Sequence, residues 1–265
     1  MCGIVGYVGP KKAEPILING LLRLEYRGYD SAGIATIEKS GIKNIKNKGR
    51  VSELLNTKGI DELEGNIGIG HTRWATHGKP SSINSHPHMD NSNTFAVVHN
   101  GIIENYAELK KELTNNGYTF LSETDTEVIP NYIHYFYKNS KETGYKKFLD
   151  AVTKACKLFV GSFGLEILCS DFPDAIIVVR KESPLVIGTS ETENYVSSDI
   201  PAILSFTKNF YLLNNLEFAY ITSDDIKFYD IDLNEIQKTV TSIEWSAAAA
   251  EKDGYEDFML KEIYE

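Results

Sequence analysis

The chain has 265 residues, of which 42% are hydrophobic and 24% charged, and its formal net charge is −10 at pH 7. This composition is typical of a globular protein that buries a sizeable core in one large domain or two small ones. An acidic chain without a basic patch argues against nucleic acid as a partner. The sequence also lacks an apolar run long enough to cross a bilayer, so we expect no membrane partner.

The three cysteines, Cys2, Cys156 and Cys169, favour a reducing compartment. An odd count without a C-x-x-C pair is unlike a disulfide framework or a structural zinc site. The beginning of the chain lacks the charged and apolar regions of a secretory signal. We therefore expect a cytoplasmic protein in which Cys156 and Cys169 are inert core thiols.

The first hundred residues predict mainly strands. Apolar residues at helical spacing predict a helix over 14–26, VSELL predicts a short helix over 51–55, and Ser40-Gly41 predicts the turn of a hairpin. Strands are expected over 4–8, 33–38, 42–48, 66–73 and 95–103. The strand that begins near residue 66 runs into the polar loop HTRWATHG, and the last strand ends in Asn-Gly.

Helices dominate the middle of the chain and strands the remainder. Helices are expected over 104–117, 124–137 and 145–159, with Asn105 and Thr124 as N-caps because a Glu follows each by three residues. A short strand is expected over 118–122. From Gly161 to Trp245 short strands alternate with turn residues. Helices enclosed by two sets of strands predict an α+β fold with antiparallel or mixed sheets.

We expect one domain over 1–245. The last twenty residues are charged and predicted to be helical, with little core to join. We interpret 246–265 as the beginning of a connection to a further region.

Cys2 has two interpretations. It is either a small buried residue near a chain end or a nucleophile exposed by removal of Met1. In the second case the thiol gains its own α-amine, whose pKa of about 7.7–8.0 suits a general base. The thiolate is the nucleophilic form of cysteine, so one residue would supply both groups.

Further candidates for chemistry follow strands or turns, and each also has a structural interpretation. Arg73 fits a carboxylate bidentately or is a surface cation. Asn100 and Gly101 form a turn or present N–H donors to an oxyanion. Asp125 favours a helix N-terminus or holds a ligand ammonium. Together with Cys2, these residues suit hydrolysis of the side-chain amide of an amino acid, and glutamine is the obvious substrate.

The histidines invite a metal interpretation, which we disfavour. H-x-H spacing alone is weak, no carboxylate pattern completes a site, and neutral histidines commonly form hydrogen bonds in cores and loops. We expect neither a metal nor another cofactor. The residues concerned are His71, His77, His86, His88 and His99.

Five motifs resemble the glutaminase domain of the glutamine–fructose-6-phosphate aminotransferase family: MCGIVGY, LEYRGYDSAG, GHTRWATHG, VHNGIIEN and SETDTE. The similarity runs from residue 2 to the terminal KEIYE. The resemblance implies the N-terminal nucleophile hydrolase fold, a four-layer αββα sandwich of two mainly antiparallel sheets. It also implies hydrolysis of L-glutamine to glutamate and ammonia through a Cys2 thioester.

The resemblance assigns roles to the residues that match the motifs. Cys2 matches the nucleophile, its α-amine the base, and Arg27 the arginine near the nucleophile. Asn100 and Gly101 match the oxyanion hole. Arg73 and Asp125 match the residues that bind the α-carboxylate and α-ammonium of glutamine. In the loop that closes over glutamine, Thr76 and His77 match binding residues and Trp74 matches the gate for ammonia transfer.

The complete enzymes of this family carry a C-terminal sugar-phosphate isomerase region that converts fructose 6-phosphate to glucosamine 6-phosphate. This chain lacks that region, so we expect it to hydrolyse glutamine only. We also expect it to be a monomer, although the full enzyme is a homodimer. Purine-pathway amidotransferases and asparagine synthetases are less similar, because they usually carry His in place of Tyr26. A glutamine-sensing module is the alternative if Met1 is retained, and an amidase for other substrates is a third hypothesis.

Overall fold

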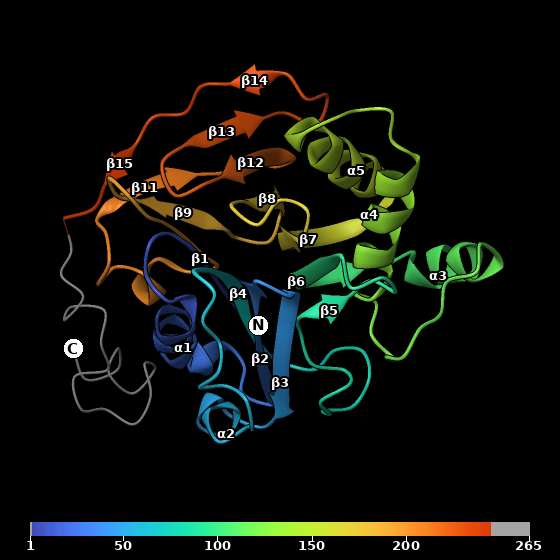
Figure 1. The fold of residues 1–265 in the computed structure, drawn as a ribbon, viewed down its shortest axis with the longest axis horizontal. Coiled ribbons are helices and arrows are strands. Elements are labelled where there is room, and N and C mark those ends of the chain that lie inside the picture. Colours follow the sequence, from blue (N-terminus) through green and yellow to red (C-terminus); the bar gives the residue numbers. More distant parts are fainter. Residues whose placement is uncertain (1, 245–265) are drawn as a thin grey trace.

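Two antiparallel sheets lie face to face, and helices cover the outer face of each (Figure 1). The computed structural model describes residues 2–244. The eight strands of the first sheet are, in spatial order, β15 (Thr241–Ser242), β11 (Asn209–Leu212), β9 (Val186–Thr189), β10 (Asn194–Ser197), β1 (Gly3–Val8), β4 (Ile67–Arg73), β2 (Ser31–Glu38) and β3 (Gly41–Lys48).

The second sheet has seven strands. They are, in spatial order, β14 (Glu235–Ile236), β13 (Ile226–Tyr229), β12 (Glu217–Ile221), β8 (Ile176–Lys181), β7 (Gly161–Cys169), β6 (Phe95–Ile103) and β5 (His88–Met89). The helices are α1 (Ala13–Arg23), α2 (Val51–Leu55), α3 (Tyr106–Asn115), α4 (Val128–Asn139) and α5 (Tyr145–Leu158), with short 3-10 turns η1 (Glu25–Arg27) and η2 (Ile200–Ala202). The four-layer αββα sandwich implied by the resemblance is confirmed.

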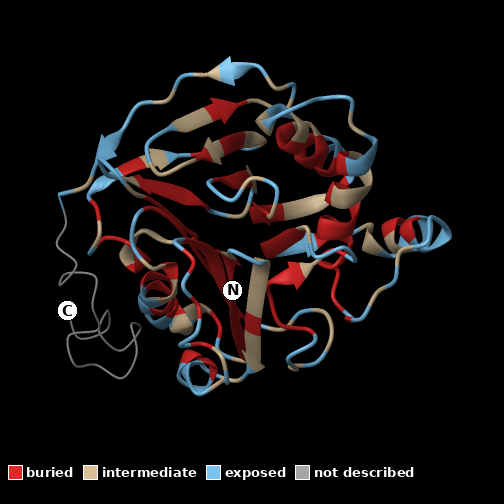
Figure 2. Cartoon of the chain, viewed as in Figure 1, coloured by how far each residue is buried: buried red, intermediate tan, exposed pale blue. Residues whose placement is uncertain are grey.

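Buried apolar side chains form three layers between these elements (Figure 2). The alternation of side chains along β1 explains how one strand serves two of them. Val5 and Tyr7 pack with Leu17 of α1 on the outer face. Ile4 and Val8 belong to the layer between the sheets.

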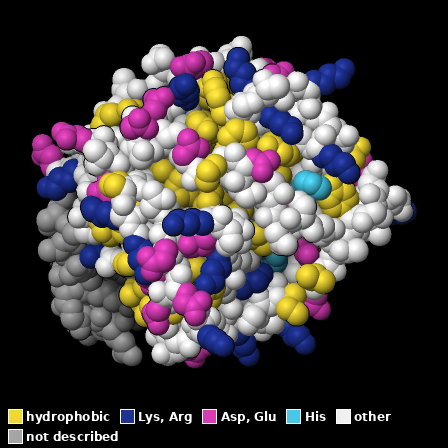
Figure 3. Space-filling view, viewed as in Figure 1, with side chains coloured by type: hydrophobic (Ala, Val, Ile, Leu, Met, Phe, Trp, Pro, Cys, Tyr) yellow, Lys and Arg dark blue, Asp and Glu magenta, His cyan; other side chains and the backbone are white. Residues whose placement is uncertain are grey.

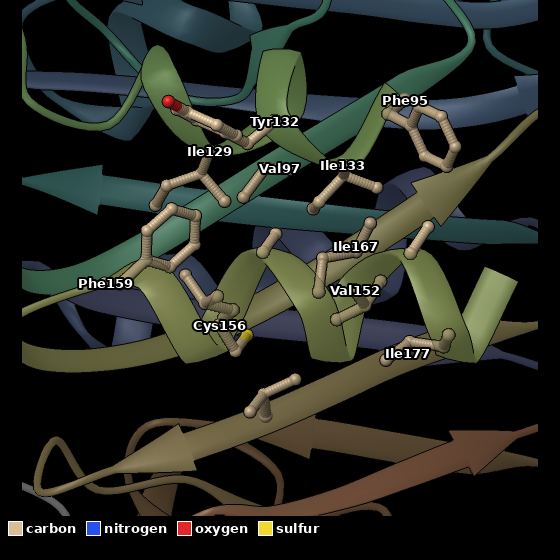
Figure 4. Packing of buried hydrophobic residues seen from close by; sticks show 14 of the residues in the cluster. Phe95, Val97, Ile129, Tyr132, Ile133, Val152, Cys156, Phe159, Ile167 and Ile177 are labelled. Carbon is tan, nitrogen blue, oxygen red and sulfur yellow. The ribbon is translucent and has the colours of Figure 1, made fainter. Parts of the chain in front are cut away.

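The third layer joins the second sheet to its two long helices. The apolar stripes of α4 and α5 follow helical spacing and face the sheet (Figure 4). Among the side chains in contact are Ile129 and Ile133 of α4, Val152 and Cys156 of α5, and Val97, Ile167 and Ile177 of the sheet. Cys156 and Cys169 are both buried free thiols, as predicted.

The predicted hairpin is confirmed, since β2 pairs with β3 around the Ser40-Gly41 turn. The strand predicted over 118–122 was wrong. Residues 118–122 form no strand, because side chains take the place of a partner strand: the Asn91 Oδ1 accepts from the Thr119 N–H, and the Glu127 carboxylate accepts from the N–H groups of Leu121 and Ser122.

Of the two predicted N-caps, Asn105 does stand at the N-cap position of α3, but its side chain bonds the backbone of Leu158 and Val160 and makes no capping hydrogen bond. The N-cap of α4 is Glu127, and Thr124 lies before it. The Thr124 hydroxyl bonds the Ser122 hydroxyl and caps no helix, since α4 begins only at Val128. The predicted helix and connection over 246–265 lie outside the described residues.

On the face seen in Figure 3, Lys and Arg side chains lie among Asp and Glu side chains. The helices within residues 2–244 are too short or too polar to cross a membrane.

Candidate functional site

Cys2 lies directly before β1, and β1 is an interior strand paired with both β4 and β10. The chain end is thereby tied into the sheet. The Trp74 N–H lies 3.3 Å from Cys2 Sγ, and Sγ lies 3.6 Å from the Trp74 carbonyl oxygen. Burial raises the pKa of the Cys2 thiol, while the Trp74 backbone and Arg73 act in the opposite direction.

The Cys2 carbonyl oxygen accepts two hydrogen bonds, one from each side of the sandwich. Arg27 donates Nε–H at 3.2 Å from η1, and Asn100 donates Nδ2–H at 3.1 Å from β6 of the second sheet. Three residues far apart in sequence therefore meet at one backbone group. An amide NH₂ has two hydrogens, so Asn100 keeps a second donor available beside Cys2.

Gly101 has a backbone conformation that other residues rarely adopt. Its φ is +130°, and a Cβ at this position would lie 2.1 Å from the Ser162 carbonyl oxygen on β7. Any other residue would push β6 away from β7 at the point where Asn100 reaches Cys2.

Arg73 ends β4 and holds the loop that follows it. One guanidinium nitrogen donates to the carbonyl oxygens of His77 and Gly78, the latter at 3.1 Å. The other terminal nitrogen, Nη1, is buried without a hydrogen-bond partner. A buried guanidinium N–H without a partner is costly, so this group is suited to an anionic ligand.

Asp125 lies on the other side of the same loop. Its Oδ2 accepts from the Ile103 N–H at 2.8 Å, and its Oδ1 is 4.0 Å from His77 Nδ1. Asp125 is buried. A cation and an anion thus both border His77, which matches the two charges of an amino acid's α-carbon substituents.

The remaining predicted loop residues are more exposed. Thr76 Oγ1 lies 3.4 Å from His77 Nδ1. Trp74 is 49% exposed, and the edge of its ring meets Tyr29, with 5.7 Å between ring centroids.

Three residues without a predicted role in catalysis also contact this site. Asp30 accepts the Ala75 N–H and so fixes the beginning of the loop. Asp199 forms a 2.8 Å ion pair with Arg27. His71 bonds Asn100. Asp30 and His71 stand in the quoted motifs LEYRGYDSAG and GHTRWATHG, but the contacts of His71 and Asp199 join elements whose proximity the sequence does not reveal.

Four histidines, His71, His86, His88 and His99, are buried near the site. Burial lowers the pKa of His71 to about 3 and lowers the pKa of the other three, so all four rings are neutral at pH 7. Within residues 2–244, no group of three His, Cys, Asp or Glu side chains is arranged to hold a metal ion.

Comparison with known proteins gives a consistent set of similarities. Residues 71–205 match the family described as "Glutamine amidotransferase domain". The whole chain is 54% identical to the glutamine–fructose-6-phosphate aminotransferase (isomerizing) of Clostridium perfringens and 48% identical to that of Thermococcus kodakarensis. It covers 42% and 43% of these relatives, so it spans less than half of their length.

A solved structure gives a third similarity. The glutamine phosphoribosylpyrophosphate amidotransferase of B. subtilis, in complex with ADP and GMP, superposes with a TM-score of 0.73 at 25% sequence identity. The match covers 88% of this chain and 50% of that one.

Proposed function

Because this chain belongs to the glutamine amidotransferase domain family, we propose that it hydrolyses L-glutamine to glutamate and ammonia with Cys2 as the nucleophile. The observation that carries the proposal is the convergence of Asn100 and Arg27 on the Cys2 carbonyl, which fixes the thiol-bearing residue beside an unused N–H donor. Such a fixed donor is of use where negative charge develops.

The proposed reaction begins once Met1 has been removed. The free α-amine of Cys2 takes the thiol proton, and Sγ attacks the γ-carbonyl carbon of glutamine. The carbonyl oxygen becomes an oxyanion, which the second Nδ2–H of Asn100 and the Gly101 N–H stabilise. When the tetrahedral carbon collapses, its C–N bond breaks, the nitrogen takes the proton from the α-amine, and ammonia leaves.

The product of that step is a thioester between Cys2 Sγ and the side-chain carbonyl carbon (Cδ) of the glutamyl group. Water attacks the same carbon, the C–S bond breaks, and the thiol is restored as glutamate leaves. Arg73 binds the α-carboxylate through its unpartnered Nη1, and Asp125 binds the α-ammonium. Thr76 and His77 cover the substrate, and Trp74 lies at the exit.

The destination of the ammonia is a further part of the proposal. This chain is 44–54% identical to glutamine–fructose-6-phosphate aminotransferases but 25% identical to the phosphoribosylpyrophosphate enzyme. These identities support a role in an aminotransferase of the first kind. In a longer protein, the ammonia would convert fructose 6-phosphate to glucosamine 6-phosphate at a C-terminal isomerase region, as a homodimer. The glutaminase domain would then occupy 1–245 and the connection would begin at 246.

The test combines intact-mass analysis with an assay of glutamate release. Protein that lacks Met1 is expected to hydrolyse glutamine, whereas protein that retains it is expected to bind glutamine without turnover, because the base is then an amide. Processed protein that binds glutamine and releases no glutamate would contradict the proposal and favour a sensor. Release of ammonia from asparagine or other amides, but not from glutamine, would indicate a different amidase.

A further inference from the structure

We propose that His71 is a positioning residue for glutamine hydrolysis, because its Nε2–H holds the Asn100 side-chain amide in the orientation that turns Nδ2 toward Cys2. This inference rests on the proposed function. The contact crosses the sandwich: His71 lies on β4 of the first sheet and Asn100 on β6 of the second. The His71 Nε2 is 3.2 Å from Asn100 Oδ1 and 3.1 Å from the His99 carbonyl oxygen.

Which atom donates in each of these hydrogen bonds follows from the two backbone carbonyl groups at either end of the chain of contacts. The carbonyl oxygens of His99 and Cys2 only accept, so His71 Nε2 and Asn100 Nδ2 must both donate. Asn100 Oδ1 then accepts from His71. If the amide were rotated by 180°, its oxygen would face the Cys2 carbonyl and its NH₂ would face the His71 N–H, so both contacts would be lost.

The surroundings of His71 fix both the protonation state and the tautomer of its ring. The side chain is fully buried, and burial lowers its pKa to about 3, so at pH 7 it is neutral with one N–H. Nδ1 is buried and has no partner, which leaves the proton on Nε2. The ring stacks on His86, with 4.1 Å between centroids and 13° between planes, and His86 Nδ1 in turn accepts from the His99 N–H at 3.3 Å.

A donor that must meet an oxyanion is useful only if it does not rotate away. Asn100 alone could present either end of its amide to Cys2. When His71 is present, the Asn100 Oδ1 accepts its N–H, and the Asn100 Nδ2 donor therefore faces the nucleophile. His71 does not touch substrate, so its effect on the reaction passes through Asn100.

The first experiment is a double-mutant cycle on glutamine hydrolysis. His71→Leu is expected to lower kcat by about 10- to 100-fold, less than the roughly 10²–10³ that loss of an oxyanion donor costs. KM for glutamine should change less than about threefold, since Arg73 and Asp125 remain. In an Asn100→Ala background the same substitution should lower kcat no further. An equal loss of kcat in both backgrounds would overturn the inference.

Two variants separate positioning from general packing. His71→Gln keeps an N–H near the Nε2 position and should restore most of the lost kcat. His88→Leu removes another buried neutral ring whose Nε2 contacts Thr124 and not Asn100, and should leave kcat within about threefold. Failure of His71→Gln to recover activity, with the fold intact by circular dichroism, would count against a role for the N–H.

A measurement on the unaltered protein needs no variant to fold. Long-range ¹H–¹⁵N spectra of the imidazoles should show His71 as the neutral Nε2–H tautomer from pH 5 to 8. A proton on Nδ1, or titration in this range, would overturn the inference even if the protein hydrolyses glutamine. Absence of any glutamine turnover in processed protein would instead refute the proposed function. The spectra would still test the contact between His71 and Asn100, because they report the position of the imidazole proton without turnover.

Discussion

Arg27 and Asp199 form a 2.8 Å ion pair directly behind the residue proposed as the nucleophile. Arg27 donates its Nε–H to the Cys2 carbonyl, and Asp199 also accepts a hydrogen bond of 2.5 Å from the Tyr26 hydroxyl. Asp199 therefore fixes the Arg27 guanidinium from one side, and the guanidinium binds the Cys2 carbonyl on the other side. Asp199 follows β10, the neighbour of β1, so the pair ties two adjacent strand ends together.

Asp199→Ala is therefore expected to lower kcat for glutamine about tenfold with little change in KM, because Arg27 loses its carboxylate partner and Cys2 is held less firmly. Steady-state glutamate release checks this. Asp232→Ala, which removes a carboxylate from an exposed pair with Lys157, is the control and should leave kcat unchanged. A wild-type kcat for Asp199→Ala would mean that Arg27 needs no support.

Cys2→Ala is expected to abolish glutamate release while glutamine binding by calorimetry is kept, because the thiol supplies the bond to substrate and the α-ammonium and α-carboxylate sites are elsewhere. Cys2→Ser keeps a hydroxyl of much weaker nucleophilicity and should retain only a trace of activity. Full turnover by either variant would contradict the role of Cys2. Cys156→Ala, a change at a buried thiol far from the site in sequence, should keep turnover and serves as the control.

Arg73→Gln should raise KM for glutamine about 10- to 100-fold, since a charge-assisted hydrogen bond contributes roughly 1.5–3 kcal/mol. The variant should also lose the preference for glutamine over 4-aminobutanamide, which lacks the α-carboxylate. Asp125→Asn should give the reciprocal result with glutaric monoamide, which lacks the α-amine. If each variant weakened all three substrates equally, the assignment of the two charges would be wrong.

Glu166 is expected to make the protein less stable as pH rises. It is fully buried between the sheets, neither carboxyl oxygen has a hydrogen-bond partner, and burial raises its pKa well above the usual value. Above the unfolded-state pKa of about 4.3, the unfolded chain releases a proton that the folded chain keeps. The free energy of unfolding then falls by about 1.4 kcal/mol per pH unit until the folded carboxyl also ionises.

Glu166→Gln should remove this slope. Urea unfolding at pH 5, 6 and 7 checks it: the stability of the variant relative to wild type should increase with pH. Glu191→Gln, at an exposed position, is the matched control and should not change the slope. A constant difference between Glu166→Gln and wild type across this range would show that Glu166 is not protonated in the fold.

Much of the fold follows from local sequence patterns. The helical spacing predicted over 14–26 places Leu17 and Leu21 on the buried face of α1, because this helix packs against one sheet with one face only. Residues 118–122 show where such patterns fail. The segment has the composition of a strand, but Asn91 and Glu127 satisfy its backbone, and neither residue is adjacent in the sequence.

The same distinction applies to the site. Cys2, Arg73, Asn100 and Asp125 lie in motifs whose residue types suggest chemistry on their own. His71 shares a motif with Arg73 and Asp199 lies outside the motifs, but the importance of both comes from contacts with Asn100 and Arg27 across or between strands. A histidine inside a strand is indistinguishable from a core histidine until the opposite sheet is known.

The position of β1 has a thermodynamic consequence. Chain ends usually fray, yet residues 3–8 pair with β4 and residues 5–8 also pair with β10 in the interior of an eight-stranded sheet, and the Cys2 carbonyl accepts two further hydrogen bonds. The conformational entropy of this chain end is therefore lost once, when the sheet forms. Each encounter with substrate then begins from a reacting group already fixed in place, so no ordering of the chain end is added to the activation free energy.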